Sequence, residues 1–68
     1  MTQDEIIETL GLTYRAEICL KAQEIYTIKQ LLECTEQRVL NIPNLGPKSL
    51  KGIIERLNER GLKLRGQP

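Results

Sequence analysis

The residues with the clearest chemical potential lie at a predicted helix start, where Gly46 and Pro47 precede Lys48 and Ser49. Gly46 can adopt a backbone conformation that is closed to most residues, so a tight turn is possible there. Pro47 suits the first helical position, because its missing N–H needs no partner. Free amides at a helix N-terminus attract anions, and Lys48 adds a charge and Ser49 a hydroxyl donor. The pattern predicts a phosphate-binding turn.

Arg15 is a second candidate, because it stands near the start of another predicted helix, where the helix dipole disfavours a cation. It is either a solvated arginine paired with an acid, or a contact to a phosphate or a nucleic-acid groove. The turn has two interpretations as well. It is either a helix–hairpin–helix that grips a nucleic-acid backbone, or an ordinary corner between two helices.

Patterns for catalysis and metal binding are missing from the sequence. It contains no histidine, and Ser49 is its single serine, with no base in sequence reach. The Gly-Pro-Lys-Ser tetrapeptide is not a P-loop, which needs an earlier glycine and a preceding strand. Cys19 and Cys34 have neither metal-ligand nor redox spacing, so we expect two free, partly buried cysteines. We therefore expect no enzyme, no cofactor and no metal.

Charge is unevenly distributed along the 68 residues, whose net charge is +1. Residues 1–34 hold three basic and six acidic residues, whereas residues 35–68 hold seven basic and three acidic ones. The basic half contains the turn, which is compatible with a polyanion site or with a solvated basic tail. No apolar run approaches the roughly 18 residues of a membrane span. We expect a cytoplasmic protein without membrane contact.

Hydrophobic periodicity predicts an all-α domain of about five short helices over residues 1–68. The first helix is expected within residues 1–11, with a capping box at residues 2–5 and a stop at Gly11. No β pattern, internal linker or low-complexity tract appears. The tail, residues 65–68, is expected to fray.

Three threonines, Thr13, Thr27 and Thr35, are the expected caps of the three middle helices. The hairpin and last helix are expected over residues 40–60, and Gly52 lies inside that helix at a cost of about 1 kcal/mol relative to alanine. The positions expected to face the core are Ile6, Ile7, Leu10, Leu12, Ala16, Cys19, Leu20, Ile28, Leu31, Leu32, Val39, Leu40, Ile42, Leu50, Ile53, Ile54, Leu57, Leu62 and Leu64.

Several short motifs resemble the C-terminal domain of the bacterial RNA polymerase alpha subunit. They are Arg15 followed by CLKA (19–22), IYTI (25–28), NLG (44–46) with KSL (48–50), and RGL (60–62). Their order and spacing cover residues 7–64 and are more specific than a lone hairpin. The resemblance implies a compact helical domain with a helix–hairpin–helix element.

The resemblance also implies partners: the minor groove of A·T-rich double-stranded DNA upstream of promoters, RNA polymerase subunits, the sigma factor and transcription activators. Localisation would be cytoplasmic and nucleoid-associated. The family's DNA-binding residues fall on Arg15, Cys19, Asn44, Gly46, Lys48 and Ser49. An arginine would enter a narrow groove of enhanced negative potential, while backbone amides would position phosphates.

The sequence departs from the family at several positions. Ile18 stands where a DNA-contacting asparagine is usual, and Gly52 replaces a glutamate that helps to orient the arginine. Pro47 replaces a frequent lysine, and Arg38 replaces an acid on the activator-facing surface. Thr9 and Gly11 stand at positions that are often acidic in the family, so the acidic patch that contacts the sigma factor has fewer charges. An alternative is therefore a protein-interaction module with reduced DNA binding. Either a free-standing relative or part of a longer subunit is compatible with the sequence.

Overall fold

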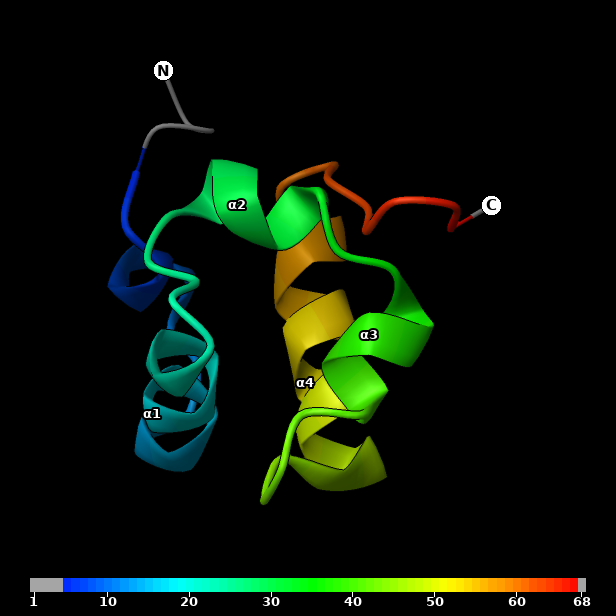
Figure 1. Ribbon diagram of the computed structural model, residues 1–68. Coiled ribbons are helices and arrows are strands. Elements are labelled where there is room, and N and C mark those ends of the chain that lie inside the picture. The colour runs from blue at the N-terminus through cyan, green and yellow to red at the C-terminus, as the bar shows by residue number, and fades with distance from the viewer. Residues whose placement is uncertain (1–4, 68) are drawn as a thin grey trace.

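The computed structural model describes residues 5–67, whose regular structure consists of short helices. A 3-10 helix, η2 (Ile7–Leu10), is followed by α1 (Tyr14–Ala22), α2 (Ile28–Leu32), α3 (Glu36–Leu40) and α4 (Gly46–Glu59) (Figure 1). Over this range the β contacts are two isolated bridges between single residues. The all-α fold that the sequence predicts is confirmed.

Threonines cap the three α-helices that precede α4, as the sequence predicts. The hydroxyls of Thr13, Thr27 and Thr35 accept the backbone amide three residues later, at 3.2, 3.1 and 3.1 Å. At Thr27 the capping box is complete, because Gln30 Oε1 accepts the Thr27 amide in return at 3.1 Å. Such caps stabilise a short helix by about 1 kcal/mol each, which matters for helices of five residues.

From residue 5 onward, the N-terminal helix is the 3-10 stretch Ile7–Leu10, which ends at Gly11 with a φ of 75°. Residues 2–4 of the expected capping box lie outside the described range. Ile6 is extended and forms an antiparallel bridge with Thr27. The bridge places Ile6 at the surface, 52% exposed, so its prediction as a core residue is wrong.

One hydrophobic cluster joins all five elements. Its buried members are Ile7, Leu10, Ala16, Cys19, Leu20, Ile25, Ile28, Leu31, Cys34, Val39, Ile42, Leu45, Leu50, Ile53, Leu57 and Leu64. Four residues expected in the core are only partly buried against it: Leu12, Leu32, Ile54 and Leu62. Both cysteines are free, and both are buried, whereas the sequence predicts them to be only partly buried. Among the described residues no polar side chain is buried, so packing of apolar side chains holds this core together.

Helix α4 is the longest element, and α3 packs against it (Figure 1). Of the apolar residues of α3, Val39 is fully buried, whereas Leu40 is 38% exposed. The prediction that Leu40 points inward is therefore wrong. No helix in residues 5–67 is long and apolar enough to cross a membrane.

The end of α4 is set by Gly61, which the sequence predicts as a stop. Gly61 adopts a φ of 73°, and its amide donates to the carbonyl of Asn58 at 2.9 Å. The amide of Leu62 donates to the carbonyl of Leu57, also at 2.9 Å. This pair of bonds is a Schellman motif, which turns the backbone towards the core.

The C-terminal tail is held to the fold as far as residue 67. Leu64 is buried, and the amide of Arg65 donates to the carbonyl of Cys34 at 3.0 Å. A parallel bridge joins Arg65 to Thr35. The sequence predicts a frayed tail over residues 65–68, but this bridge depends on a partner far away in sequence. Residue 68 lies outside the described range.

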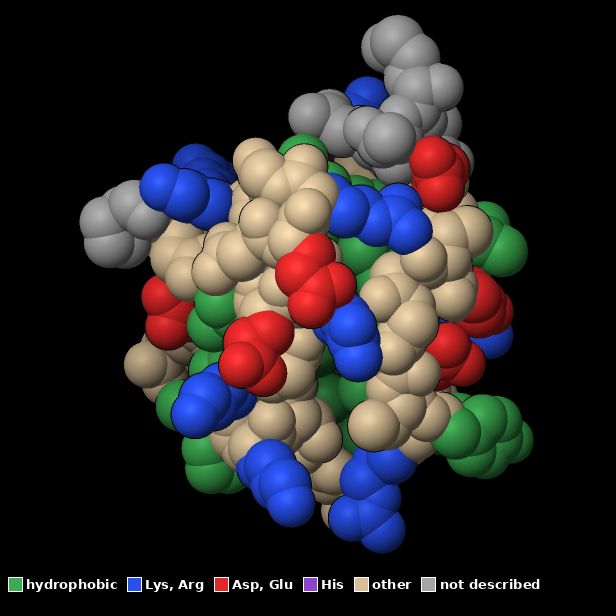
Figure 2. Space-filling model, turned by 180° about the vertical axis from the view of Figure 1, so that it is seen from behind, with side chains coloured by type: hydrophobic (Ala, Val, Ile, Leu, Met, Phe, Trp, Pro, Cys, Tyr) green, Lys and Arg blue, Asp and Glu red, His purple; other side chains and the backbone are tan. Residues whose placement is uncertain are grey.

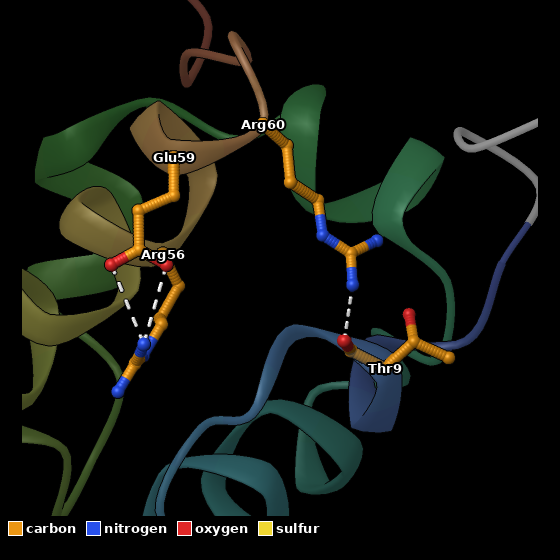
Figure 3. A network of polar contacts seen from close by, with 4 residues as sticks. All are labelled: Thr9, Arg56, Glu59 and Arg60. Carbon is orange, nitrogen blue, oxygen red and sulfur yellow. Dashed lines mark hydrogen bonds and ion pairs between the residues drawn. The ribbon is translucent and has the colours of Figure 1, made fainter.

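Polar contacts at the surface tie α4 to the N-terminal segment. Arg60 donates to the carbonyl of Thr9 (Figure 3) and lies 3.5 Å from a carboxylate oxygen of Glu5. On η2, a hydrogen bond from Lys21 lowers the pKa of Glu8, and the same bond raises the pKa of Lys21. This ion pair joins η2 to α1. It is exposed, so water screens it strongly.

Candidate nucleic-acid interface

The turn between α3 and α4 is tight and contains left-handed backbone, as its glycine predicts. Gly46 adopts a φ of 79°, and Asn44, two residues earlier, adopts a φ of 69°. Left-handed backbone is normal for glycine and is tolerated by asparagine among the other residues. Between them, the amide of Leu45 donates to the carbonyl of Ile42 at 3.2 Å. The backbone therefore reverses within a few residues and enters α4 directly.

The start of α4 differs from the starts of the other α-helices. Its N-cap is Leu45, whose apolar side group offers no hydrogen-bond acceptor, and Pro47 brings no amide to the first turn. In residues 5–67, the amides of Gly46 and Lys48 have no side-chain cap. They lie at the positive end of the helix dipole. An anion is the ligand that such a helix start favours.

A groove of about 770 Å³ runs between α1 and α4, and we call it the α1–α4 groove. Arg15 contributes to it from α1, and Lys48 and Ser49 contribute from the first turn of α4. The fold thus brings together an arginine and a lysine–serine pair that lie far apart in sequence. Figure 2 shows the face opposite to that of Figure 1, where Lys and Arg side chains lie at the lower end and also at the centre and upper part.

The charge of the α1–α4 groove is mainly positive. Arg56 lines it but is paired with Glu59, at 3.2 Å (Figure 3). Within residues 5–67, no carboxylate forms an ion pair with Arg15, Lys48 or Lys51. Three cations therefore remain available to an anionic ligand, with Glu55 as the one acidic lining residue outside the Arg56 pair.

The other residues that the sequence proposes do not line the α1–α4 groove. Cys19 follows Arg15 by one helical turn and is only 7% exposed. Asn44 is exposed on the turn, and Gly46 is partly buried at the start of α4. Asn44 and Gly46 are close in sequence to the lining residues, whereas Cys19 is chiefly a packing residue of α1.

Lys51 and Gly52 are among the lining residues that are absent from the site that the sequence proposes. Lys51 follows Lys48 by three residues, and that spacing places both on one side of a helix. The sequence therefore contains a signal for Lys51. Periodicity does not predict that Gly52 lines the same groove as Arg15, but the family resemblance does connect position 52 with the arginine.

Gly52 weakens α4 without a packing reason. A Cβ placed at Gly52 would meet no atom within 4 Å, and its φ is not positive. Replacing Gly52 by alanine should therefore raise the free energy of unfolding by about 0.5–1 kcal/mol, since alanine costs less backbone entropy in a helix. For so small a domain, the melting temperature should rise by about 4 °C, measured by circular dichroism.

The matched control is Gly61→Ala, which makes the same chemical change at a φ of 73°. Alanine is strained in that conformation, so this variant should melt at a lower temperature than the parent. If Gly52→Ala also destabilised the domain, the space around Gly52 would have to be filled, and the open position of Gly52 on α4 would be wrong.

The fold and the groove define a small all-α domain with a cationic face formed by a helix start and an arginine from a second helix. Residues 1–59 match the family described as the C-terminal domain of the bacterial RNA polymerase alpha subunit. The protein belongs to this family, since the match covers most of its length. Membership implies a DNA-binding, transcription-associated role for a domain that is an accessory part of RNA polymerase.

Proposed function

We propose that the α1–α4 groove binds the minor groove and phosphates of A·T-rich duplex DNA. The observation that carries this proposal is that Arg15, Lys48 and Ser49 line one groove at the uncapped start of α4. Cations and free amides in one place suit a polyanion. A helix–hairpin–helix, formed by α3, the turn and α4, would present this surface to the DNA.

In this proposal, the start of α4 binds the DNA backbone. Lys48 supplies a charge, Ser49 a hydroxyl donor, and the amides of Gly46 and Lys48 donate to phosphate oxygens. Asn44, exposed on the turn, adds a donor next to them. Contacts of this kind fix the position of a protein on DNA but do not read its sequence.

Arg15 would supply the preference for A·T-rich DNA. Such DNA has a narrow minor groove, where the negative potential is enhanced and attracts arginine. Arg15 is exposed and forms no ion pair with any carboxylate in residues 5–67, so binding would break no existing ion pair. Cys19, one helical turn after Arg15 and almost buried, would contribute least of the proposed residues.

RNA polymerase subunits, sigma factor or activators are the protein partners that we propose.

The proposal is tested by titrating the labelled protein with duplexes of equal length, one A·T-rich and one G·C-rich, at low and moderate salt. Amide shifts should cluster at Arg15, Gly46, Lys48 and Ser49, and should be larger for the A·T-rich duplex. Higher salt should weaken both, because phosphate contacts release counterions. An absence of shifts at low salt would overturn DNA binding, and equal shifts with both duplexes would overturn the A·T preference.

We propose as a second candidate function a protein-interaction module with weakened DNA binding. Tyr14 is 77% and Ile18 46% exposed, and they lie one helical turn apart on the helix that carries Arg15. An exposed apolar pair is common at protein contacts, although single cases occur on any surface. This candidate predicts that RNA polymerase holoenzyme or a regulator retains the domain and that Ile18→Asp abolishes retention. Retention that is equal for the parent and the variant would overturn it.

A further inference from the structure

We propose that Lys51 is an additional DNA-phosphate contact of this domain, an inference that rests on the proposed DNA binding of the α1–α4 groove. Lys51 lies on α4 and lines the groove together with Arg15, Lys48 and Ser49. Its side chain is exposed, and no carboxylate of residues 5–67 forms an ion pair with it.

The position of Lys51 on α4 suits a row of phosphates. Residues three apart on a helix have Cβ atoms about 5–6 Å apart, so Lys48 and Lys51 are neighbours on its surface. Lys48 stands at the helix start, and Lys51 follows one turn further along the groove. A strand bound at the start of α4 and running along the groove would meet both charges in succession.

Gly52, the neighbour of Lys51, adds no side chain to the surface of the groove. Gly52 has no side chain, and a Cβ built there would find empty space within 4 Å. A ligand strand can therefore approach the body of α4 at this point without a clash. The lysine stem is long and flexible, so its ammonium group can reach over the glycine to a phosphate.

A groove cation can instead stabilise its own helix through an ion pair. Lys51 could support α4 through an ion pair with Glu55, four residues later, but the structure records no such pair among the described residues. Arg56, the next groove cation, is already paired with Glu59. Lys51 lines the groove, lies outside the site that the sequence proposes, and has no ion pair within residues 5–67. It can therefore exchange water for a phosphate without breaking an ion pair in that range.

The test measures affinity for one A·T-rich duplex over a series of salt concentrations, for the parent and for Lys51→Gln. Each phosphate contact contributes about 0.9 to the slope of log K against log salt. Lys51→Gln should bind several-fold more weakly at low salt, with a slope shallower by about that amount and an unchanged melting temperature. The matched control is Lys63→Gln, the same change at an exposed lysine outside the groove, which should keep the parental slope.

Failure of this inference differs from failure of the proposed function. If the parent binds and Lys51→Gln has the parental slope, Lys51 makes no phosphate contact, while the groove still binds DNA. If Lys51→Gln and Lys63→Gln lose affinity equally, the effect is one of net charge and the assignment is overturned. If the parent itself does not bind at low salt, the proposed function fails, and the assignment of Lys51 fails with it.

Discussion

Replacing Arg15 by alanine is expected to remove most DNA binding while leaving the fold intact. Arg15 is exposed on α1 and is not part of the hydrophobic cluster, so alanine leaves no cavity in the core. An arginine held in a narrow minor groove is desolvated and paired with the DNA. Losing one partner of such a pair costs about 2–5 kcal/mol, or at least about thirtyfold in Kd.

The measurement is a titration of the parent and Arg15→Ala with the same A·T-rich duplex at matched salt. Arg38→Ala is the control, because it removes an exposed arginine from α3 that does not line the α1–α4 groove. It should lose little affinity, and both variants should melt like the parent. If Arg15→Ala bound like the parent, the minor-groove role of Arg15 would be wrong.

A contrast between Arg15 and Lys51 separates two kinds of contact. Arg15 is proposed to enter the minor groove, so its loss should reduce the difference in affinity between A·T-rich and G·C-rich duplexes. Lys51 is proposed to contact phosphate, so its loss should weaken both complexes equally. The two effects are therefore distinguishable in one set of titrations, without any assumption about their absolute sizes.

Local signals in the sequence account for most of the helices. Thr13, Thr27 and Thr35 cap the helices where expected, because a cap depends only on residues within one helical turn. Gly46 and Gly61 mark the start and the end of α4 for the same reason: each adopts the left-handed conformation for which glycine is suited. These features need no knowledge of the tertiary structure.

The errors concern residues whose environment is set by distant partners. Periodicity predicts Ile6 in the core, but its bridge to Thr27 holds it at the surface. Composition predicts a frayed tail at Arg65, but its amide is bonded to the carbonyl of Cys34. Neither partner is close in sequence, so local patterns cannot reveal either contact.

The candidate site is predictable in part. The glycine-containing turn before a helix start indicates Lys48 and Ser49 as anion-binding residues. The positive charge of Arg15 near a helix start, where the helix dipole disfavours a cation, indicates Arg15. That these three line one groove depends on how the fold places α1 relative to α4, which local sequence patterns do not specify. The family resemblance alone assigns all three to one DNA-binding surface. The spacing of Lys51 from Lys48 is only a weak signal in the sequence, because a lysine on a helix surface is usually solvated; its place in the groove is what distinguishes it.

Replacing Leu57 by alanine is expected to come close to unfolding the domain. Leu57 is fully buried in α4 and does not line the α1–α4 groove. Truncating a buried leucine to alanine costs about 2–5 kcal/mol, because transfer energy is lost and a cavity remains. A domain of this size has a stability of only about 3–5 kcal/mol. In urea, Leu57→Ala should therefore unfold at a far lower midpoint than the parent, or lack a folded baseline.

The control for Leu57→Ala is Leu40→Ala, the same chemical change at a leucine that is 38% exposed on α3. Its partly exposed side chain has less apolar contact to lose, and the space it leaves opens to solvent, so the cost should be about 1 kcal/mol or less. Equal losses in the two variants would mean that Leu40 is packed as tightly as Leu57. The inward orientation that periodicity predicts for Leu40 would then be right, and the placement of α3 on α4 would be wrong.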